Sequence, residues 1–504
     1  MYLTFDIGTT SVKVVLFSPE GRLVRKSIRN YTLATPAVGW YEADPEEYWR
    51  GVVEGAREVM DGVDPAEVRT VSGCSQGETA IFLDAAGRTV RPAIVWLDLR
   101  ARAESDELAA LASRDELYAI TGQTEFDPTW TAAKVLWVKK HQPDVFRDTA
   151  HVLLVEDYIT WKLTGRFCST TNLLSSSLFV DIHRERYWDR LVDSLGIGNR
   201  LPELLTPGDA VGSVSPDAAR ELGILPRTLV VKGAMDQAAS AVGAGNIAPG
   251  IVTETTGTVM AIGVTSTRFD PDLPVRLPYQ PHLLHGSILY LPYVQTAGGA
   301  YKWWRDQFCQ EEIQAAGGLE AAYDRMNQAA AAVPEGAEGL VFLPFLAGAG
   351  QPEVDPDARG VFYGLTLKHG KGHCARAIME SIACLLRKIL ADFQRSGLPL
   401  KEVRSMGGGA RSDLWLQIKA DVIGVPLVRM EEEETSTLGA ALLAAVCVGD
   451  HPDLASAASH MVRLGDRFFP RPGVREAYNR SFALYNELYR ALAPVFRRFS
   501  ISAS

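Results

Sequence analysis

The chain has 504 residues, of which 47% are hydrophobic and 22% are charged, and its formal net charge is −10. This length exceeds one hydrophobic core and predicts roughly two to four domains. The negative balance argues against DNA or RNA as the main partner, because phosphate binding needs a basic face. Six cysteines lie far apart without a CxxC pair, which argues against a disulfide framework or zinc ribbon. With neither a signal-peptide pattern nor an apolar run of membrane-spanning length, we expect a soluble cytoplasmic protein.

Two β-prone runs open the chain, at residues 2–7 and 12–17, around the turn "DIGTTS". This pattern predicts a hairpin with Asp6 at the end of its first strand. Backbone N–H groups and Thr hydroxyls of such a turn can bind phosphate oxygens. Asp6 could hold a hydrated magnesium ion, which often takes only one or two protein carboxylates. The alternative is an ordinary hairpin turn that contains an acid.

Strands and helices then alternate, which indicates α/β layers. "DPEEYWRGVVEGAREVM" at 44–60 predicts a helix with Asp44 as its N-cap. "VRTVSGCSQ" at 68–76 reads as a strand, and helical patterns follow at 106–121 and 131–146. A last long helix is predicted at 474–499.

The middle of the chain places a carboxylate between an apolar strand and a run of small residues. In "LVVKGAMDQAASAVG" at 229–243, Asp236 begins the small-residue segment. Burying a charge is costly unless it is paired or used, so Asp236 either accepts the proton of a substrate hydroxyl or caps the following helix, and these two roles are compatible. The next segment, "IVTETTGTVMAIGV" at 251–264, echoes the opening hairpin, and we place a domain boundary near residue 246.

Two glycine-rich segments follow. "SMGGGARSDLW" at 405–415 and "QTAGGAYKWW" at 295–304 would let the backbone approach a flat ligand such as adenine, although plain turns have the same composition. "EEEET" at 431–435 is expected to precede a helix start, where negative charge suits the helix dipole. Neither GxxxxGK[ST] nor a strand-to-helix GxGxxG occurs, so any nucleotide binds by another route.

Together these segments resemble the FGGY family of carbohydrate kinases, most closely its xylulokinase branch, over nearly the whole chain. "FDIGTTSVKVVLF" is similar to the family's first phosphate-binding hairpin. "TAAKVLWVKKHQPDVF" and "GVFYGLTLKHGKGHCARAIME" are similar to its two signature segments, with matching Lys134, Gly360, Gly364 and Glu380.

The resemblance implies an α/β fold of two ribonuclease-H-like domains of the actin and sugar-kinase type, with an interdomain cleft. Residues 1–246 would form an N-terminal FGGY domain with the sugar site and the first phosphate hairpin. Residues 247–504 would form a C-terminal FGGY domain that binds the nucleotide. The implied ligands are ATP, Mg²⁺ and a small sugar or polyol, with no nucleic acid and no membrane partner, and a homodimer is a reasonable family expectation.

The resemblance also implies roles for individual residues. Asp236 matches the general base and Asp6 the carboxylate near magnesium, and both are assigned to the metal. The nucleotide-binding candidates are Gly8, Thr9, Thr10, Lys13, Gly257, Thr258, Gly298, Lys302, Gly408, Gly409 and Ala410. The substrate-binding candidates are Gln76, Gly77, Glu78, Asp98, Arg100 and Gln237.

One segment departs from the resemblance. Where xylulokinases typically carry a Met-His pair, this chain has Gly77 and Glu78. "QGET" is partly similar to the Gln-Arg-Glu-Thr of glycerol kinases, with Gly77 in place of the Arg. We therefore expect phosphorylation of a primary hydroxyl, with a ketopentose such as xylulose as first candidate. The alternatives are glycerol, erythritol or another polyol, or an inactive actin-like nucleotide-binding scaffold, against which the retention of Asp6 and Asp236 argues.

Overall fold

The structure is a computed structural model that describes residues 1–270, 273 and 276–498. Contacts divide the chain into two units. The first comprises Met1–Ile247, Pro278–Leu289 and Glu434–Val462, and the second comprises the described residues of Ala248–Leu277, Tyr290–Glu433 and those from Arg463 onward. The division after Ile247 lies beside the predicted boundary near residue 246, but two later segments, expected in the second half, pack with the first unit.

The first unit is built on a six-stranded sheet in the order β13-β14-β5-β1-β2-β3. Its strands are β1 (Tyr2–Ile7), β2 (Ser11–Phe17), β3 (Leu23–Asn30), β5 (Thr70–Ser75), β13 (Ala210–Ser213) and β14 (Leu229–Met235). β1, β5 and β14 run parallel, whereas β1, β2 and β3 form an antiparallel meander. The predicted opening hairpin is therefore confirmed. Alternate residues of its strands pack into one core, and most of the residues between them are also buried, because both faces of the sheet are covered.

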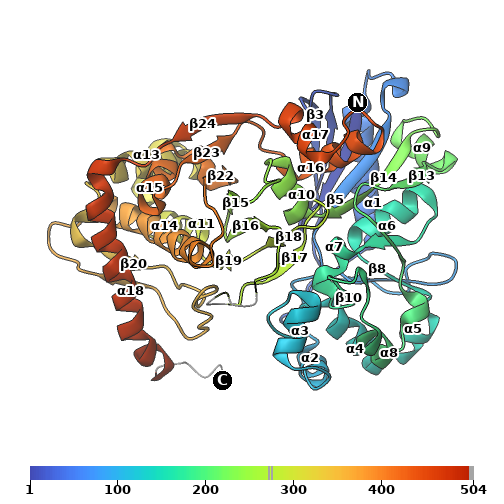
Figure 1. The fold of residues 1–504 in the computed structure, drawn as a ribbon, viewed down its shortest axis with the longest axis horizontal. Coiled ribbons are helices and arrows are strands. Elements are labelled where there is room, and N and C mark those ends of the chain that lie inside the picture. The colour runs from blue at the N-terminus through green and yellow to red at the C-terminus, as the bar shows by residue number, and fades with distance from the viewer. Residues whose placement is uncertain (271–272, 274–275, 499–504) are drawn as a thin grey trace. The chain divides into compact units, whose positions relative to one another are not determined.

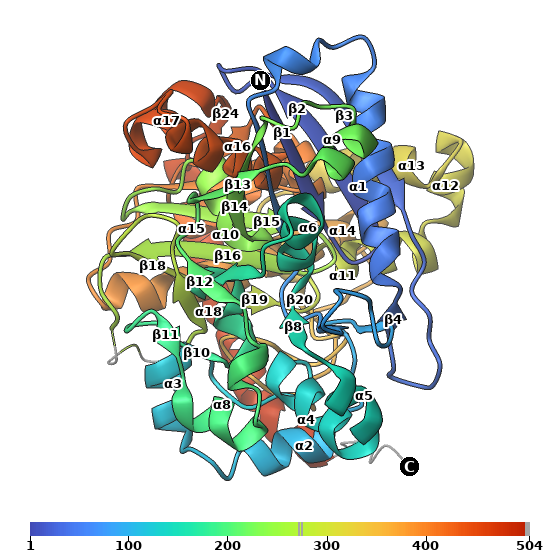
Figure 2. The same ribbon diagram turned by 90° about the vertical axis from the view of Figure 1, so that its right-hand side faces the viewer.

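Helices cover both faces of this sheet (Figures 1 and 2). On one face, α1 contacts β2 and β3 and also packs on α6 and α9; on the other, α16 contacts β1, β5 and β14 and packs on α10. The helices of the first unit are α1 (Pro45–Met60), α2 (Arg102–Leu108), α3 (Arg114–Thr121), α4 (Thr131–His141), α5 (Pro143–Asp148), α6 (Val155–Thr164), α7 (Thr171–Leu174), α8 (Asp189–Leu195), α9 (Pro216–Leu222), α10 (Asp236–Gly243), α16 (Thr435–Cys447) and α17 (Leu454–Met461). Its short strands are β4 (Glu42–Ala43), β6 (Ile81–Leu83), β7 (Ala93–Ile94), β8 (His151–Leu153), β9 (Cys168–Thr170), β10 (Val180–Asp181), β11 (Arg186–Tyr187), β12 (Glu203–Leu205) and β17 (Tyr279–Pro281), and β18 (Ile288–Tyr290) ends at the division between the units.

Local sequence signals explain several helix ends. The predicted helix at 44–60 is confirmed as α1, with Asp44 accepting a hydrogen bond from the amide of Glu46 (3.0 Å). The helical pattern at 106–121 is two helices, because Ser113 starts a new one by accepting from the amide of Glu116 (3.1 Å). The pattern at 131–146 is likewise divided at Pro143, which cannot continue α4.

The helices α10 and α16 cross with their backbones in direct contact. A Cβ atom on Gly243 would lie 1.8 Å from the carbonyl oxygen of Thr435, and one on Gly439 would lie 1.9 Å from that of Ala239. Only glycine allows this approach. The crossing also brings the hydroxyls of Ser240 and Thr435 within 2.8 Å.

His282 lies buried in the segment that returns to the first unit. Its Nε2 lies 3.0 Å from the carbonyl of Asn246, and its Nδ1 accepts a hydrogen bond from the amide of Leu284 (2.8 Å). Nε2 must therefore donate, and both bonds together require the neutral imidazole. Burial lowers the pKa of His282 from its ordinary 6.5 to about 4.

We expect the free energy of unfolding to fall as the pH drops from 6.5 toward about 4, because the unfolded chain then takes up a proton that folded His282 does not. At about 1.4 kcal/mol per pKa unit, this loss reaches about 3 kcal/mol. His282→Gln, whose amide nitrogen can still donate to Asn246, should remove that part of the pH dependence. Urea unfolding across this pH range measures it, with the exposed His285→Gln as control. An unchanged pH dependence in H282Q would contradict the assignment.

The second unit repeats the hairpin arrangement of the first. Its sheet contains the order β16-β15-β22-β23-β24, in which β15 pairs antiparallel with β16 and parallel with β22, as β1 does with β2 and β5. The strands are β15 (Ile251–Thr256), β16 (Met260–Ser266), β19 (Tyr293–Val294), β20 (Val341–Leu343), β21 (Val361–Tyr363), β22 (Glu402–Met406), β23 (Leu427–Met430) and β24 (Leu464–Phe468). The helices are α11 (Gly298–Phe308), α12 (Gln310–Ala316), α13 (Leu319–Ala331), α14 (Lys371–Arg395), α15 (Asp413–Ile423) and α18 (Arg475–Arg498). The predicted last helix is confirmed as α18, and residue 499 lies outside the described residues.

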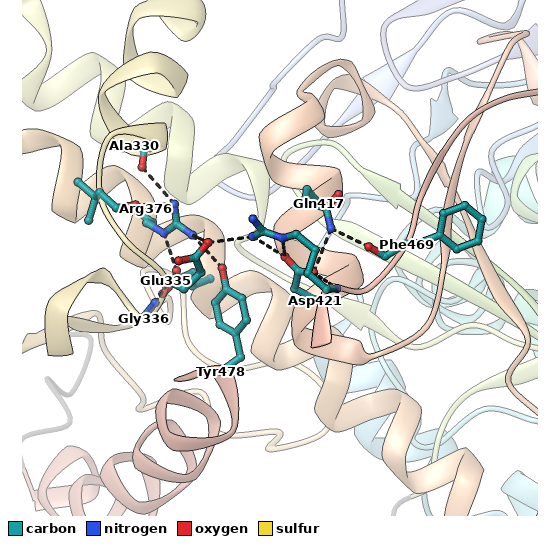
Figure 3. Close-up of polar contacts among 11 residues, drawn as sticks. Ala330, Glu335, Gly336, Arg376, Gln417, Asp421, Phe469 and Tyr478 are labelled. Atoms are coloured by element: carbon teal, nitrogen blue, oxygen red, sulfur yellow. Dashed lines mark hydrogen bonds and ion pairs between the residues drawn. The ribbon is translucent and has the colours of Figure 1, made fainter. Parts of the chain in front are cut away.

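A buried polar network connects α18 to α14 within the second unit (Figure 3). Arg376 of α14 donates to Glu380 (2.8 Å), to the hydroxyl of Tyr478 on α18 (2.9 Å) and to the carbonyl of Val333 (2.7 Å). Glu380 also accepts from the amide of Gly336 (3.0 Å). These bonds give the signature residue Glu380 a structural role. Within the described part of the chain, no helix is long and apolar enough to cross a membrane.

Candidate active site

The parallel strands β1, β5 and β14 end side by side, in register at Ile7, Ser75 and Met235. The polar residues singled out by the sequence follow or immediately precede these ends: Asp6 with the hairpin turn, the loop at 76–78, and Asp236. The carboxyl edge of parallel strands is the usual ligand site of an α/β sheet. The first unit therefore gathers its candidate residues at one edge.

The Asp6 carboxylate is held on one side only. Its Oδ2 accepts a hydrogen bond from the hydroxyl of Ser436 (2.8 Å), at the start of α16. Its Oδ1 is buried and has no hydrogen-bond partner among the described residues. Burial raises the pKa of Asp6, although the nearby Lys13 ammonium opposes this. One oxygen is thus fixed while the other remains available to a ligand.

Lys13 lies directly across the hairpin from Asp6 and forms an ion pair with Glu434 (2.9 Å). Glu434 also pairs with Lys26 (3.1 Å). The expected helix start after the acidic run is confirmed, since α16 begins at Thr435. The sequence analysis did not predict the contacts of Glu434 and Ser436, because their partners Lys13, Lys26 and Asp6 lie more than 400 positions earlier in the chain. The one local signal was the polar "ETS" at the start of an otherwise apolar helix.

Asp236 is the first residue of α10, and Met235 occupies the cap position. The interpretation of Asp236 as the N-cap is therefore wrong by one residue, although its charge still suits the helix N-terminus. Burial raises the pKa of Asp236 well above its ordinary value, and the carboxylates of Asp6 and Glu78 raise it further. A carboxylate with a raised pKa is a stronger base than that of an ordinary aspartate.

The loop after β5 holds Glu78 in a conformation that is unusual for a non-glycine residue, with a φ of 57°. Its carbonyl oxygen accepts hydrogen bonds from Lys134 Nζ (3.0 Å) and Thr131 Oγ1 (3.0 Å), both on α4. Lys134 is fully enclosed, and burial lowers its pKa to about 7. The signature lysine thus holds the Glu78 backbone in place.

The neighbours of Glu78 leave little spare room. A Cβ atom on Gly77 would lie 2.8 Å from the hydroxyl oxygen of Ser176. The Gln76 side chain is buried, and neither of its amide atoms has a hydrogen-bond partner among the described residues. Burial raises the pKa of Glu78. Gln237 follows Asp236 at the start of α10 and is half-buried.

Asp98 and Arg100 bond to each other and are fully enclosed. The guanidinium of Arg100 donates to Asp98 (2.8 Å) and stacks over Trp40 at 4.0 Å, and Asp98 also accepts from the amide of Tyr41 (2.6 Å). Within the described part of the chain the polar groups of this pair bond to protein partners, and its role in substrate binding stays a prediction.

Two aromatic side chains fix the tip of the first hairpin. The indole of Trp96 donates to the hydroxyl of Thr9 (2.9 Å), and the hydroxyl of Tyr31 donates to the carbonyl of Gly8. The amide of Tyr31 also bonds to the carbonyl of Thr10 (3.0 Å). The turn is therefore held in one conformation before any ligand arrives.

The hairpin tip of the second unit lies against glycine-rich backbone. A Cβ atom on Gly298 would lie 2.3 Å from the carbonyl oxygen of Gly257, and one on Gly409 would lie 2.7 Å from Thr256 Cβ. The amide of Gly299 bonds to the carbonyl of Thr258 (3.0 Å). The structure thus brings Gly257, Thr258, Gly298 and Gly409 together.

A cavity of about 270 Å³ opens beside this glycine-rich backbone, at the carboxyl ends of β22 and β23. It is lined by Ser405, Met406, Gly407, Ala410, Arg411, Arg429, Met430, Glu432 and Glu433. Lys302 instead pairs with Asp306 (3.3 Å) on the outer surface of α11 and is 59% exposed.

The carboxylates fit a hydrated divalent cation. In the described ranges, no group of three or more His, Cys, Asp or Glu residues could hold a metal ion. Magnesium needs only one or two protein carboxylates, since water fills its other positions. The buried and unpartnered Oδ1 of Asp6 supplies one such ligand, and Asp236 lies close enough for the charge of Asp6 to raise its pKa.

Comparisons with known proteins identify the family of the chain. The model of the FGGY family of carbohydrate kinases, N-terminal domain, matches residues 1–243, and that of its C-terminal domain matches residues 250–448. The chain belongs to the FGGY family. As a member of it, this FGGY protein is an ATP-dependent carbohydrate kinase, and the expected α/β fold of the family is confirmed by solved structures.

Individual relatives cover nearly the whole of this kinase. The xylulose kinase of Bacillus subtilis (strain 168) is 29% identical, over 96% of this chain and 95% of the relative. The gluconokinase of Bacillus licheniformis is also 29% identical, over 97% and 96%. The crystal structure of xylulose kinase from Rhodospirillum rubrum is 30% identical and superposes with a TM-score of 0.90, covering 98% of this chain and 99% of that one.

Proposed function

We propose that this chain transfers the γ-phosphoryl group of ATP to a primary hydroxyl of a small sugar, with a ketopentose such as xylulose as the first candidate substrate. The observation that carries the proposal is the pair of carboxylates at one edge of the first sheet, where Asp236 has a raised pKa and Asp6 keeps one buried oxygen unpartnered. Similarity to xylulose kinases over nearly the whole chain supports the substrate class.

In the proposed mechanism, Asp236 accepts the proton of the substrate hydroxyl as that oxygen attacks the γ-phosphorus. The new bond joins the sugar oxygen to phosphorus, the bond from phosphorus to the β,γ-bridging oxygen breaks, and ADP leaves with that electron pair. Positioning and electrostatic stabilisation supply most of the rate in phosphoryl transfer. In the fixed hairpin the amides of Thr9 and Thr10 would donate hydrogen bonds to the negatively charged phosphates, because the amide of Gly8 already donates to the carbonyl of Ser11 (3.0 Å).

Magnesium, held by Asp6 and Asp236, would neutralise part of the phosphate charge. Ser436 would keep Asp6 oriented through the hydrogen bond to Oδ2. The further nucleotide-binding residues in this proposal are Gly8, Lys13, Gly257, Thr258, Gly298, Gly408, Gly409 and Ala410. Lys302 would reach a nucleotide only by leaving Asp306.

A second candidate is a linear polyol such as glycerol or erythritol, and Glu78 favours it. This carboxylate takes the place of a His in the xylulokinase pattern, and it affects the pKa of Asp236. In the proposed site Glu78 would accept hydrogen bonds from substrate hydroxyls, with Gln76, Gly77 and Gln237 beside it. A site built to bond a hydroxyl rejects ligands that lack it strongly.

A coupled assay of ADP release with ATP and magnesium distinguishes these candidates. The panel contains D- and L-xylulose, D- and L-ribulose, gluconate, erythritol, xylitol and glycerol. We expect kcat/KM for one ketopentose to exceed the others, and Glu78→Gln to lower it about tenfold or more through a lost charged hydrogen bond. The exposed Glu20→Gln serves as control. A preference for glycerol or erythritol would select the second candidate, and no sugar-dependent ADP release would contradict both.

A further inference from the structure

Four buried residues of the second unit form a closed polar network beneath the β15–β16 hairpin. Lys419 Nζ donates to Glu254 Oε1 (2.6 Å) and to Thr256 Oγ1 (2.8 Å), and Thr256 donates to Glu254 Oε2 (2.6 Å). The hydroxyl of Ser405 donates to Glu254 Oε1. Each of the four is at most 1% exposed. None of the proposed roles so far uses Glu254 or Lys419.

The fold itself does not require charge at this place. In the first hairpin, the residues one and three positions before the glycine of the tip are Ile7 and Phe5. Both are buried among apolar side chains, and Phe5 packs on Gly73 of the parallel strand. The same positions in the second hairpin hold Thr256 and Glu254. Apolar side chains can therefore fill these two positions of the hairpin, as they do in the first unit.

Buried ion pairs are a poor way to gain stability, because desolvation offsets most of their attraction. Where a protein contains a buried ion pair, the pair can instead fix the positions of the groups that are bonded to it. Here Glu254 bonds two such groups, the hydroxyls of Thr256 and Ser405.

The two residues that carry these hydroxyls adjoin the candidate nucleotide-binding backbone. Thr256 is the last residue before the hairpin tip, and its atoms lie 2.7 Å and 2.9 Å from Cβ positions built on Gly409 and Gly407. Ser405 lines the cavity of about 270 Å³ together with Gly407. A displacement of either residue would therefore move the wall of the cavity or the tip of the hairpin.

We propose that Glu254 and Lys419 are positioning residues of the nucleotide site: their ion pair locks the hairpin tip to the cavity wall, so that the backbone meets ATP in one preformed arrangement. This inference rests on the proposed nucleotide role of Gly257, Gly409 and their neighbours. Loss of the Glu254–Lys419 ion pair is therefore expected to weaken nucleotide binding and to leave sugar binding by the first unit unchanged.

The test removes the ion pair between Glu254 and Lys419 but keeps their positions filled with apolar side chains. Glu254→Leu/Lys419→Met replaces the pair by apolar side chains, which is often neutral for stability. We expect an unfolding temperature near that of the wild type, a KM for ATP and a Kd for ADP raised about tenfold, and a KM for sugar changed less than twofold. Calorimetric titration with ADP measures binding independently of turnover.

A milder variant keeps the test decisive if the double variant does not fold. Thr256→Val removes one hydroxyl and leaves the Glu254–Lys419 pair intact, and we expect it to weaken ADP binding about fivefold while Thr256→Ser restores it. Wild-type ADP affinity in every variant that folds would overturn the inference. A wild-type protein that binds no ADP would instead remove the proposed nucleotide site itself, and the inference with it.

Discussion

Replacing Asp236 with asparagine is expected to lower the turnover number by about 10²- to 10⁴-fold, the usual contribution of a general base. Asparagine has nearly the same shape but cannot accept the proton of the substrate hydroxyl. Because the ionised carboxylate is disfavoured where it stands, as its raised pKa shows, its removal should leave the unfolding temperature unchanged or slightly higher. Steady-state kinetics at saturating sugar and ATP measure the loss.

The matched control is Asp189→Asn. Asp189 is also the first residue of a short helix, α8, but its side chain is 70% exposed. This variant should keep wild-type turnover, which separates the loss of a catalytic base from the loss of a charge at a helix start. Turnover of Asp236→Asn within a few-fold of the wild type would refute the assignment of Asp236 as the base.

Replacing Gly439 with alanine is expected to destabilise the first unit by about 3 kcal/mol or more, at or above the upper end of typical overpacking costs. Helix propensity alone predicts the opposite, a gain of about 1 kcal/mol, because Gly439 lies in the interior of α16. The added Cβ atom would lie 1.9 Å from the carbonyl oxygen of Ala239, and a backbone atom cannot move aside as a side-chain end can. The sign of the effect therefore decides between the two arguments.

Thermal and urea unfolding measure this effect, with Gly473→Ala as control because a Cβ atom there meets nothing within 4 Å. Since α16 also carries Ser436, which orients Asp6, the surviving folded fraction of G439A should show weakened activity as well. An increase in the unfolding temperature of G439A would show that the two helices are not held backbone to backbone.

Sequence reasoning succeeded where the relevant signal is local. The opening hairpin, the capped helix α1 and the aspartates beside strand ends each depend on a few consecutive residues. It failed where partners are distant in the chain: Ser436 meets Asp6 across 430 positions, and nothing near either residue indicates the other. It also could not show that the side chains of Asp98 and Arg100, whose substrate-binding role stays a prediction, are enclosed and bonded to each other.

The domain organisation shows the same limit. An echo between two hairpins placed a boundary near residue 246, and the contacts divide the chain after Ile247. The return of Glu434–Val462 to the first unit depends on the glycine contacts between α10 and α16. Isolated glycines in a helical pattern have many causes, so this return could not be read from composition or periodicity.

The central claim is phosphoryl transfer to a primary hydroxyl, and the most direct measurement is product analysis by phosphorus NMR after incubation with magnesium, ATP and D-xylulose. The account predicts one ADP and one sugar phosphate for each ATP consumed, with the phosphate on the terminal carbon, and no such product from Asp236→Asn over the same time. Release of ADP with inorganic phosphate alone, at a rate that does not depend on sugar, would contradict it.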